Sequence, residues 1–211
     1  MAQFFVVHPE QPQPRLIRQA AEIVRGGGLI ALPTDSAYAL GGRVGDPGVI
    51  ERIRRIRKMD ERRHLTLVCR DLSEIAHYAR VDNAQYRLLK AATPGSYTFI
   101  LEGTKELPRR VLHPKRKTIG LRVPDHPLVQ ALLAELDEPL LTASLILPDE
   151  VEPLSDPDEI RRRLEKDVDV IIDAGPCGAQ ATTVVDLTGG APTLIRVGKG
   201  DLALLGLEAP D

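Results

Sequence analysis

The chain has 211 residues, of which 43% are hydrophobic and 27% are charged, with two cysteines and a formal net charge of −2. This composition is typical of a folded globular protein and excludes a disordered chain or a disulfide-rich secreted scaffold. No stretch approaches the roughly 18 apolar residues that a membrane span needs. The N-terminus lacks the basic start of a signal peptide, so a cytoplasmic location is expected.

Hydrophobic periodicity predicts alternating helices and strands along the chain. Apolar residues at helical spacing, with start and stop signals at the ends, predict helices over residues 14–25, 47–58, 72–80, 82–93, 126–136 and 156–168. Short apolar or alternating runs predict strands over residues 29–34, 64–70, 96–103, 118–124, 139–147, 168–175, 182–188 and 193–198. This order predicts a single α/β domain with a twisted mixed sheet flanked by helices.

Several predicted strands end in small polar residues. Thr34-Asp35-Ser36 follows the apolar run "LIALP", Thr142 and Ser144 lie in "PLLTASLIL", and Thr182-Thr183 opens another strand. Ligands of open α/β sheets bind beyond strand ends, where hydroxyls can donate to phosphate or carboxylate oxygens. Each hydroxyl could equally satisfy a turn backbone. Neither a P-loop nor a strand-linked G-x-G-x-x-G is present, and the cysteines and histidines lack zinc-site spacing.

Charge is unevenly distributed along the chain. Residues 1–128 hold 22 Lys+Arg against 13 Asp+Glu, whereas residues 129–211 hold 6 against 17. The runs "RIRRIRKMDERR" (52–63) and "RRVLHPKRKTIGLR" (109–122) carry much of the positive charge. Such runs bind polyanions through counterion release, although they also serve as solvated faces. We therefore expect RNA contacts from the basic residues of the second run, namely Arg109, Arg110, Lys115, Arg116 and Lys117.

Four segments together, in this order and spacing, resemble the YrdC/YciO family. They are "GGLIALPTDSAYALGG", "TPGSYTFIL", "TIGLRVPDHP" and "TTVVDLT…LIRVG", and the resemblance is closest to the YciO branch. It covers residues 12–200, leaving 1–11 and 201–211 as terminal extensions. It implies a concave basic surface that holds ATP with Mg²⁺, L-threonine and bicarbonate. Active members make threonylcarbamoyl-adenylate for tRNA modification, with release of pyrophosphate.

The resemblance also implies roles for individual residues. Thr34, Arg122 and Thr182 (or Thr183) would contact the threonine-like substrate, and Lys58, Ser144 and Arg196 would bind the nucleotide, with Thr98 lining the site. No nucleophilic catalytic residue is implied, because the reaction depends on positioning and on cations against phosphate charge.

Three positions depart from the family pattern: Asp60 replaces an arginine, Cys69 a histidine and Ile146 an asparagine. A carboxylate beside a triphosphate opposes binding, although Arg62 or Arg63 could replace the missing arginine if the loop shifts. Three functions therefore remain open. One is a weak or altered L-threonylcarbamoyladenylate synthase. Another is a non-catalytic protein of the YciO branch that binds tRNA or double-stranded RNA. The third is a regulatory protein that binds a small nucleotide.

Overall fold

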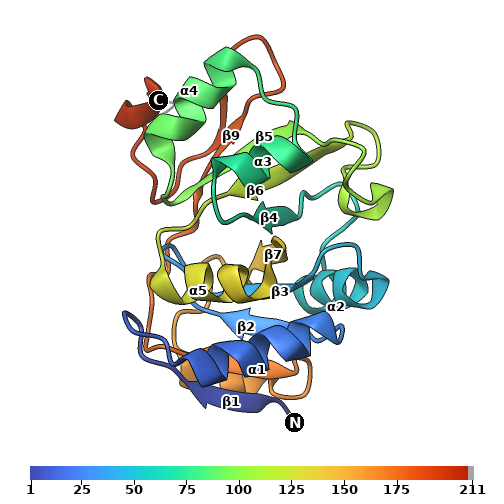
Figure 1. Ribbon diagram of the computed structural model, residues 1–211, viewed down its shortest axis with the longest axis vertical. Coiled ribbons are helices and arrows are strands. Elements are labelled where there is room, and N and C mark those ends of the chain that lie inside the picture. The colour runs from blue at the N-terminus through green and yellow to red at the C-terminus, as the bar shows by residue number, and fades with distance from the viewer. Residues whose placement is uncertain (209–211) are drawn as a thin grey trace.

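The computed structural model describes residues 1–208 as a twisted sheet between layers of helices (Figure 1). Its helices are α1 (Pro14–Arg25), α2 (Pro47–Arg57), α3 (Leu72–Tyr78), α4 (Asn83–Ala92), α5 (Pro127–Leu136) and α6 (Pro157–Leu164), with 3₁₀ turns η1 (Arg109–Val111) and η2 (Ala203–Leu205). Its strands are β1 (Gln3–Val6), β2 (Ile30–Leu32), β3 (Ala39–Arg43), β4 (Thr66–Val68), β5 (Tyr97–Glu102), β6 (Thr118–Arg122), β7 (Leu140–Ser144), β8 (Val170–Asp173), β9 (Thr183–Asp186) and β10 (Thr193–Arg196).

The strands form one mixed sheet in the order β1-β8-β2-β3-β7-β4-β6-β5-β9-β10. The expected fold class is therefore confirmed. Residues 1–11, which the sequence placed in an extension, supply the edge strand β1, which pairs in parallel with β8. Of the C-terminal extension, residues 209–211 lie outside the described residues. No helix among the described residues is long and apolar enough to cross a membrane.

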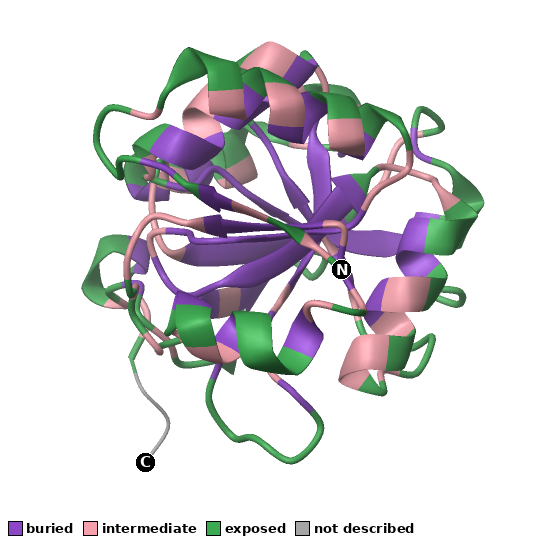
Figure 2. Ribbon diagram, turned by 90° about the horizontal axis from the view of Figure 1, so that it is seen from below, coloured by how far each residue is buried: buried purple, intermediate pink, exposed green. Residues whose placement is uncertain are grey.

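Two apolar clusters cover the two faces of the sheet, and Figure 2 shows the buried strands between the helical layers. In β2, Ile30 packs in the cluster with α1 and α5, whereas its neighbour Ala31 packs in the cluster that includes α2, α3, α4 and α6. This opposite placement of neighbours follows from the period of two in a strand. Strands buried on both faces explain why the apolar runs are nearly continuous rather than alternating.

Strand β3 was not anticipated from the sequence, because "ALGGR" resembles a turn. A Cβ atom on Gly42 would come within 2.6 Å of the Val49 side chain in α2. Glycine is therefore required there for close packing between helix and strand. The pairing of β4 with β7, in which Thr66 lies opposite Thr142, then joins the two halves of the sheet.

Candidate functional site

The chain turns back on itself where β2 ends, and Thr34 forms that turn. Its hydroxyl accepts hydrogen bonds from the backbone N–H groups of Ser36 and Ala37, both at 3.2 Å, and donates to the Ala37 carbonyl at 2.6 Å. Thr34 is 3% exposed, so the hydroxyl satisfies backbone groups that water does not reach. Proline, hydroxyls and a carboxylate thus end this strand because the chain must reverse tightly into the antiparallel β3.

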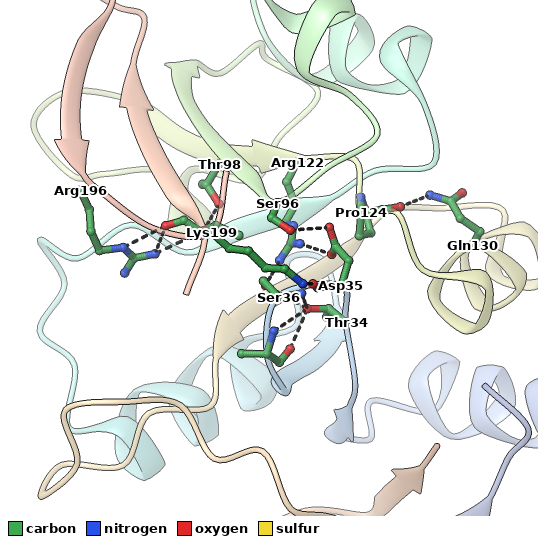
Figure 3. A network of polar contacts seen from close by, with 12 residues as sticks. Thr34, Asp35, Ser36, Ser96, Thr98, Arg122, Pro124, Gln130, Arg196 and Lys199 are labelled. Atoms are coloured by element: carbon green, nitrogen blue, oxygen red, sulfur yellow. Dashed lines mark hydrogen bonds and ion pairs between the residues drawn. The ribbon is translucent and has the colours of Figure 1, made fainter. Parts of the chain in front are cut away.

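Beside this turn lies a buried ion pair between Asp35 and Arg122 of β6, seen at the centre of Figure 3. The Arg122 guanidinium also donates to the Ser36 hydroxyl at 3.2 Å, and Ser96 donates to the Asp35 carboxylate at 3.0 Å. Burial lowers the pKa of Arg122, and the charge of Asp35 opposes that change. The Lys199 ammonium donates to the Asp35 carbonyl. The segment after β10 is thereby attached to the turn.

A cavity of about 470 Å³ opens over this pair, at the centre of the sheet. Its charged lining residues are Arg57, Arg62, Arg63, Arg122 and Arg196, and its hydroxyl residues are Thr34, Ser36, Tyr38, Thr66, Thr98, Thr142, Ser144 and Thr182, with His64 alongside. Among the described residues, no aspartate or glutamate lines the cavity. The lining therefore favours anions that accept many hydrogen bonds.

Residues far apart in the sequence meet in this cavity. Thr34, Arg122, Thr182, Ser144 and Arg196, which the sequence singled out, all line it. Thr98 lines it too, and its hydroxyl lies 2.8 Å from that of Thr182. The alternation of side chains along a strand places them there: on β6, Gly120 and Arg122, two positions apart, both face the cavity.

Thr182 rather than Thr183 faces the cavity. Arg196 holds the Thr182 backbone by donating Nε and a terminal nitrogen to its carbonyl at 3.1 and 2.9 Å (Figure 3). Thr183 instead donates to the Gly200 carbonyl at 2.7 Å and is completely buried. Of the alternatives that the sequence left open, only Thr182 can reach a ligand in the cavity.

Lys58 lies outside the cavity lining, and Arg57 takes its place. Helix α2 ends in a Schellman motif: Met59 N–H bonds the Arg54 carbonyl at 3.0 Å, and Lys58 N–H bonds the Arg55 carbonyl at 3.3 Å. Lys58 adopts the left-handed conformation, with φ of 46°, and its side chain is exposed. The preceding Arg57 lines the cavity. Sequence alone did not reveal this placement, because lysine rarely marks a left-handed helix end.

The Arg57 guanidinium is held in an electropositive environment. Its Nε donates to the Ile146 carbonyl at 3.1 Å. Burial, together with the positive charges of Arg63 and Arg196, lowers the pKa of Arg57 to about 10. Because desolvation and like charges both disfavour the charged form, a bound anion would be stabilised at this end of the cavity.

The three departures from the family pattern lie outside the lining. Asp60 is exposed, and its carboxylate accepts from the backbone N–H groups of Arg62 and Arg63 at 2.9 and 3.1 Å. Cys69 is completely buried in the apolar core, and burial raises the pKa of its thiol. Ile146 contributes its backbone carbonyl, to which Arg57 donates, rather than a side-chain amide.

The residues expected to contact RNA lie on the surface around η1 and the following loop. Arg109, Arg110, Lys115 and Lys117 are exposed, and none has a carboxylate within 4.0 Å in the described part of the chain. Arg116 differs because it pairs with the buried Asp186 at 2.6 Å. His113 connects this loop to the cavity, since its ring centroid lies 5.1 Å from that of His64. His64 Nε2 is hydrogen-bonded to the Thr118 hydroxyl at 2.7 Å.

The described residues include no group of three or more His, Cys, Asp or Glu that could hold a metal ion.

Fold and cavity define a class of α/β proteins with a twisted mixed sheet and, over its centre, a cavity lined by arginines and hydroxyls. The family model described as "Telomere recombination", which covers Sua5, YciO and YrdC, matches residues 22–198. The chain belongs to the Sua5/YciO/YrdC family. It is 56% identical to YciO of Escherichia coli K12 over 202 residues, 96% of this chain and 98% of that one. The crystal structure of E. coli YciO superimposes with a TM-score of 0.95, covering 97% of this chain and 100% of the other.

More distant relatives carry a functional name. The human threonylcarbamoyl-AMP synthase is 28% identical over 179 residues, which span 82% of this chain and 63% of the human one. The structure of P. abyssi Sua5 complexed with L-threonine matches with a TM-score of 0.84 and 25% identity, covering 92% of this chain and 57% of Sua5.

Proposed function

We propose that the cavity binds ATP, carried with Mg²⁺, together with L-threonine or a similar amino acid. With bicarbonate, the bound substrates yield threonylcarbamoyl-adenylate at a low rate, or a related acyl-adenylate, in the context of tRNA modification. The observation that carries this proposal is the cavity itself: five arginines and many hydroxyls, with no carboxylate among the described lining residues. The threonine complex of the relative Sua5 supports the amino-acid part of the proposal.

The reaction needs positioning rather than a protein nucleophile. The threonine amine attacks the carbon of bicarbonate, forming a C–N bond and releasing water. The resulting carbamate oxygen attacks the α-phosphorus of ATP, and the bond to the β-phosphate oxygen breaks to release pyrophosphate. Guanidinium groups stabilise charge on the departing phosphates, and donors that are already in place make that stabilisation larger than in water.

Each residue from the sequence analysis that lines the cavity takes a place in this proposal. Arg122, fixed by Asp35, offers N–H donors for the amino-acid carboxylate, and the Thr34 and Thr182 hydroxyls flank it. Ser144 and Arg196, which also line the cavity, contact the nucleotide. The lining also includes apolar side chains that suit a flat purine ring, namely Ile100, Val184 and Ile195.

The test measures pyrophosphate release by purified protein with ATP, Mg²⁺, bicarbonate and L-threonine. We expect release that depends on threonine and falls at least tenfold in Arg196→Ala, the size expected when a charge-assisted hydrogen bond to phosphate is removed. Arg55→Ala is the matched control. Arg55 is an exposed arginine on α2, outside the cavity lining, and its only carboxylate neighbour among the described residues is Asp167 at 3.8 Å. Absence of threonine-dependent release, with no ATP binding by calorimetry, would refute the proposal.

A second candidate function is binding of double-stranded RNA or tRNA without catalysis. Four exposed cations with no nearby carboxylate among the described residues favour it: Arg109, Arg110, Lys115 and Lys117. The logarithm of the affinity for a short RNA duplex should then fall linearly with the logarithm of salt concentration. In the double variant Lys115→Ala/Lys117→Ala that slope should shrink by about 0.7–0.9 for each phosphate that is no longer neutralised. The exposed Lys166, just beyond the end of α6, provides the control substitution. An unchanged slope would exclude this surface as an RNA-binding site.

A further inference from the structure

We propose that Asp60 is a positioning residue that holds Arg62 and Arg63 at the cavity, so that they form, with Arg57 and Arg196, one site for a pyrophosphate or triphosphate group. This inference rests on the proposed function only for the nucleoside attached to that group. The phosphate site itself depends only on contacts within this chain.

The end of α2 determines which cations enter the site. Its Schellman motif places Lys58 in the left-handed conformation with an exposed side chain, outside the cavity lining. Arg57 lines the cavity, and its Nε is fixed on the Ile146 carbonyl at 3.1 Å. In the described part of the chain, no hydrogen bond engages the two terminal nitrogens of Arg57. They form a planar fork suited to two phosphate oxygens.

Asp60 organises the loop that follows. In the sequence its carboxylate looks like a charge reversal beside the phosphates. In the structure that carboxylate accepts hydrogen bonds from the backbone N–H groups of Arg62 and Arg63, at 2.9 and 3.1 Å. The Asp60 carbonyl also accepts from the Arg63 N–H at 3.3 Å. A side chain that closes a turn in this way restricts the backbone of the residues that it bonds.

The positions of Arg62 and Arg63 then complete a concentrated positive charge. Both line the cavity, and neither side chain takes part in a hydrogen bond or ion pair among the described residues. Arg63 and Arg196 lie close enough to Arg57 to disfavour its charged form. A single carboxylate would neutralise only one of these four guanidinium groups. A pyrophosphate or triphosphate carries several negative charges and many acceptor oxygens, so we commit to that class of ligand.

The test uses inorganic tripolyphosphate as the probe, without nucleoside or threonine, in a calorimetric titration at low ionic strength. Asp60→Ala should weaken binding about tenfold, because it removes two turn hydrogen bonds. Asp60→Asn should stay within about twofold of the unsubstituted protein, because the amide oxygen can accept the same two N–H groups. If Asp60 acted only through its charge, both substitutions would strengthen binding. That result would overturn the inference.

Further variants test the arginines. Arg57→Ala should weaken tripolyphosphate binding at least tenfold, whereas Arg55→Ala, on the same helix but outside the lining, should have less than a twofold effect. If Lys58→Ala weakens binding as much as Arg57→Ala, Arg57 is not the residue of this helix end that binds the phosphates. Circular dichroism and thermal melting establish that each variant is folded before its binding is compared.

The outcomes separate the inference from the proposed function. Tripolyphosphate binding with the expected variant pattern, but without threonine-dependent pyrophosphate release, supports the phosphate site and refutes the synthase. Pyrophosphate release that Asp60→Ala and Arg57→Ala leave unchanged refutes the phosphate site and keeps the synthase. Absence of tripolyphosphate binding overturns the inference.

Discussion

Replacing Asp35 by alanine should strongly destabilise the fold, because it leaves the Arg122 charge buried and unpaired. The two side chains are 9% and 7% exposed, and Asp35 is the carboxylate that faces this guanidinium in the described structure. Removing one partner of such a pair costs about 3–5 kcal/mol. Domains are stable by only about 5–15 kcal/mol, so this is a large fraction of the total. For a chain of this size it corresponds to a fall in Tm of roughly 6–20 °C.

Urea denaturation at equilibrium measures this effect through the midpoint, provided that the slope m is unchanged. The milder Asp35→Asn retains an acceptor for Ser96 and should lose less stability, which keeps the experiment useful if the alanine variant does not fold. The double variant Asp35→Ala/Arg122→Met removes both charges and should recover most of the loss, because an apolar side chain can replace a buried pair at little cost. The reasoning fails if Asp35→Ala costs less than about 1 kcal/mol, or if the effects of the two substitutions are additive.

Three further predictions test other parts of the structure. Burial, with His113 and Arg116 nearby, lowers the pKa of His64 below its ordinary 6.5. Just below about pH 6.5, His64 of the unfolded chain therefore binds a proton that His64 of the folded chain does not. Stability should therefore fall as the pH drops from about 7.5 to about 5.5, and His64→Gln should reduce that slope in urea titrations; an unchanged slope would contradict the assignment. Gly198→Ala places a Cβ within 2.4 Å of the Thr182 backbone and should lower the free energy of unfolding by about 1–3 kcal/mol. It should also weaken ATP binding in calorimetry, because it displaces Thr182 in the cavity lining. Unchanged ATP binding would argue against a role for Thr182 in the site. Phe99→Ala, at a completely buried position, should cost about 3–5 kcal/mol by urea denaturation, and a loss below about 1 kcal/mol would mean that the site is less tightly packed than described.

Local patterns in the sequence predicted most of the elements correctly, because helix periodicity and turn chemistry depend on neighbouring residues. The helices expected over residues 72–80 and 82–93 correspond to α3 and α4, whose starts are capped by the side chains of Asp71 and Asp82. Strand β3 escaped notice because its glycines are required by packing against Val49 and Leu140 of other elements. Strand β1 has only four residues, and it is defined by its pairing with β8, in which Gln3 lies opposite Val170.

The candidate site was predicted in part, for a similar reason. Hydroxyls at strand ends could be recognised from the sequence, and Thr34, Ser144 and Thr182 do line one cavity. The register at the end of α2 could not be recognised, because a left-handed lysine carries no sequence signal comparable to glycine. The family resemblance favoured Lys58, whereas the structure places Arg57 in the cavity lining.

Residue types at short spacing, and motifs in a fixed order, were enough to establish the class of fold, the family and the polar character of the strand ends. Only the tertiary structure shows which charged side chains form pairs. Asp35 and Arg122 pair across 87 positions, and Asp60 turns its carboxylate onto the backbone instead of into the cavity. Electrostatic energy depends on distance and burial in space, and neither quantity can be read from the order of residues.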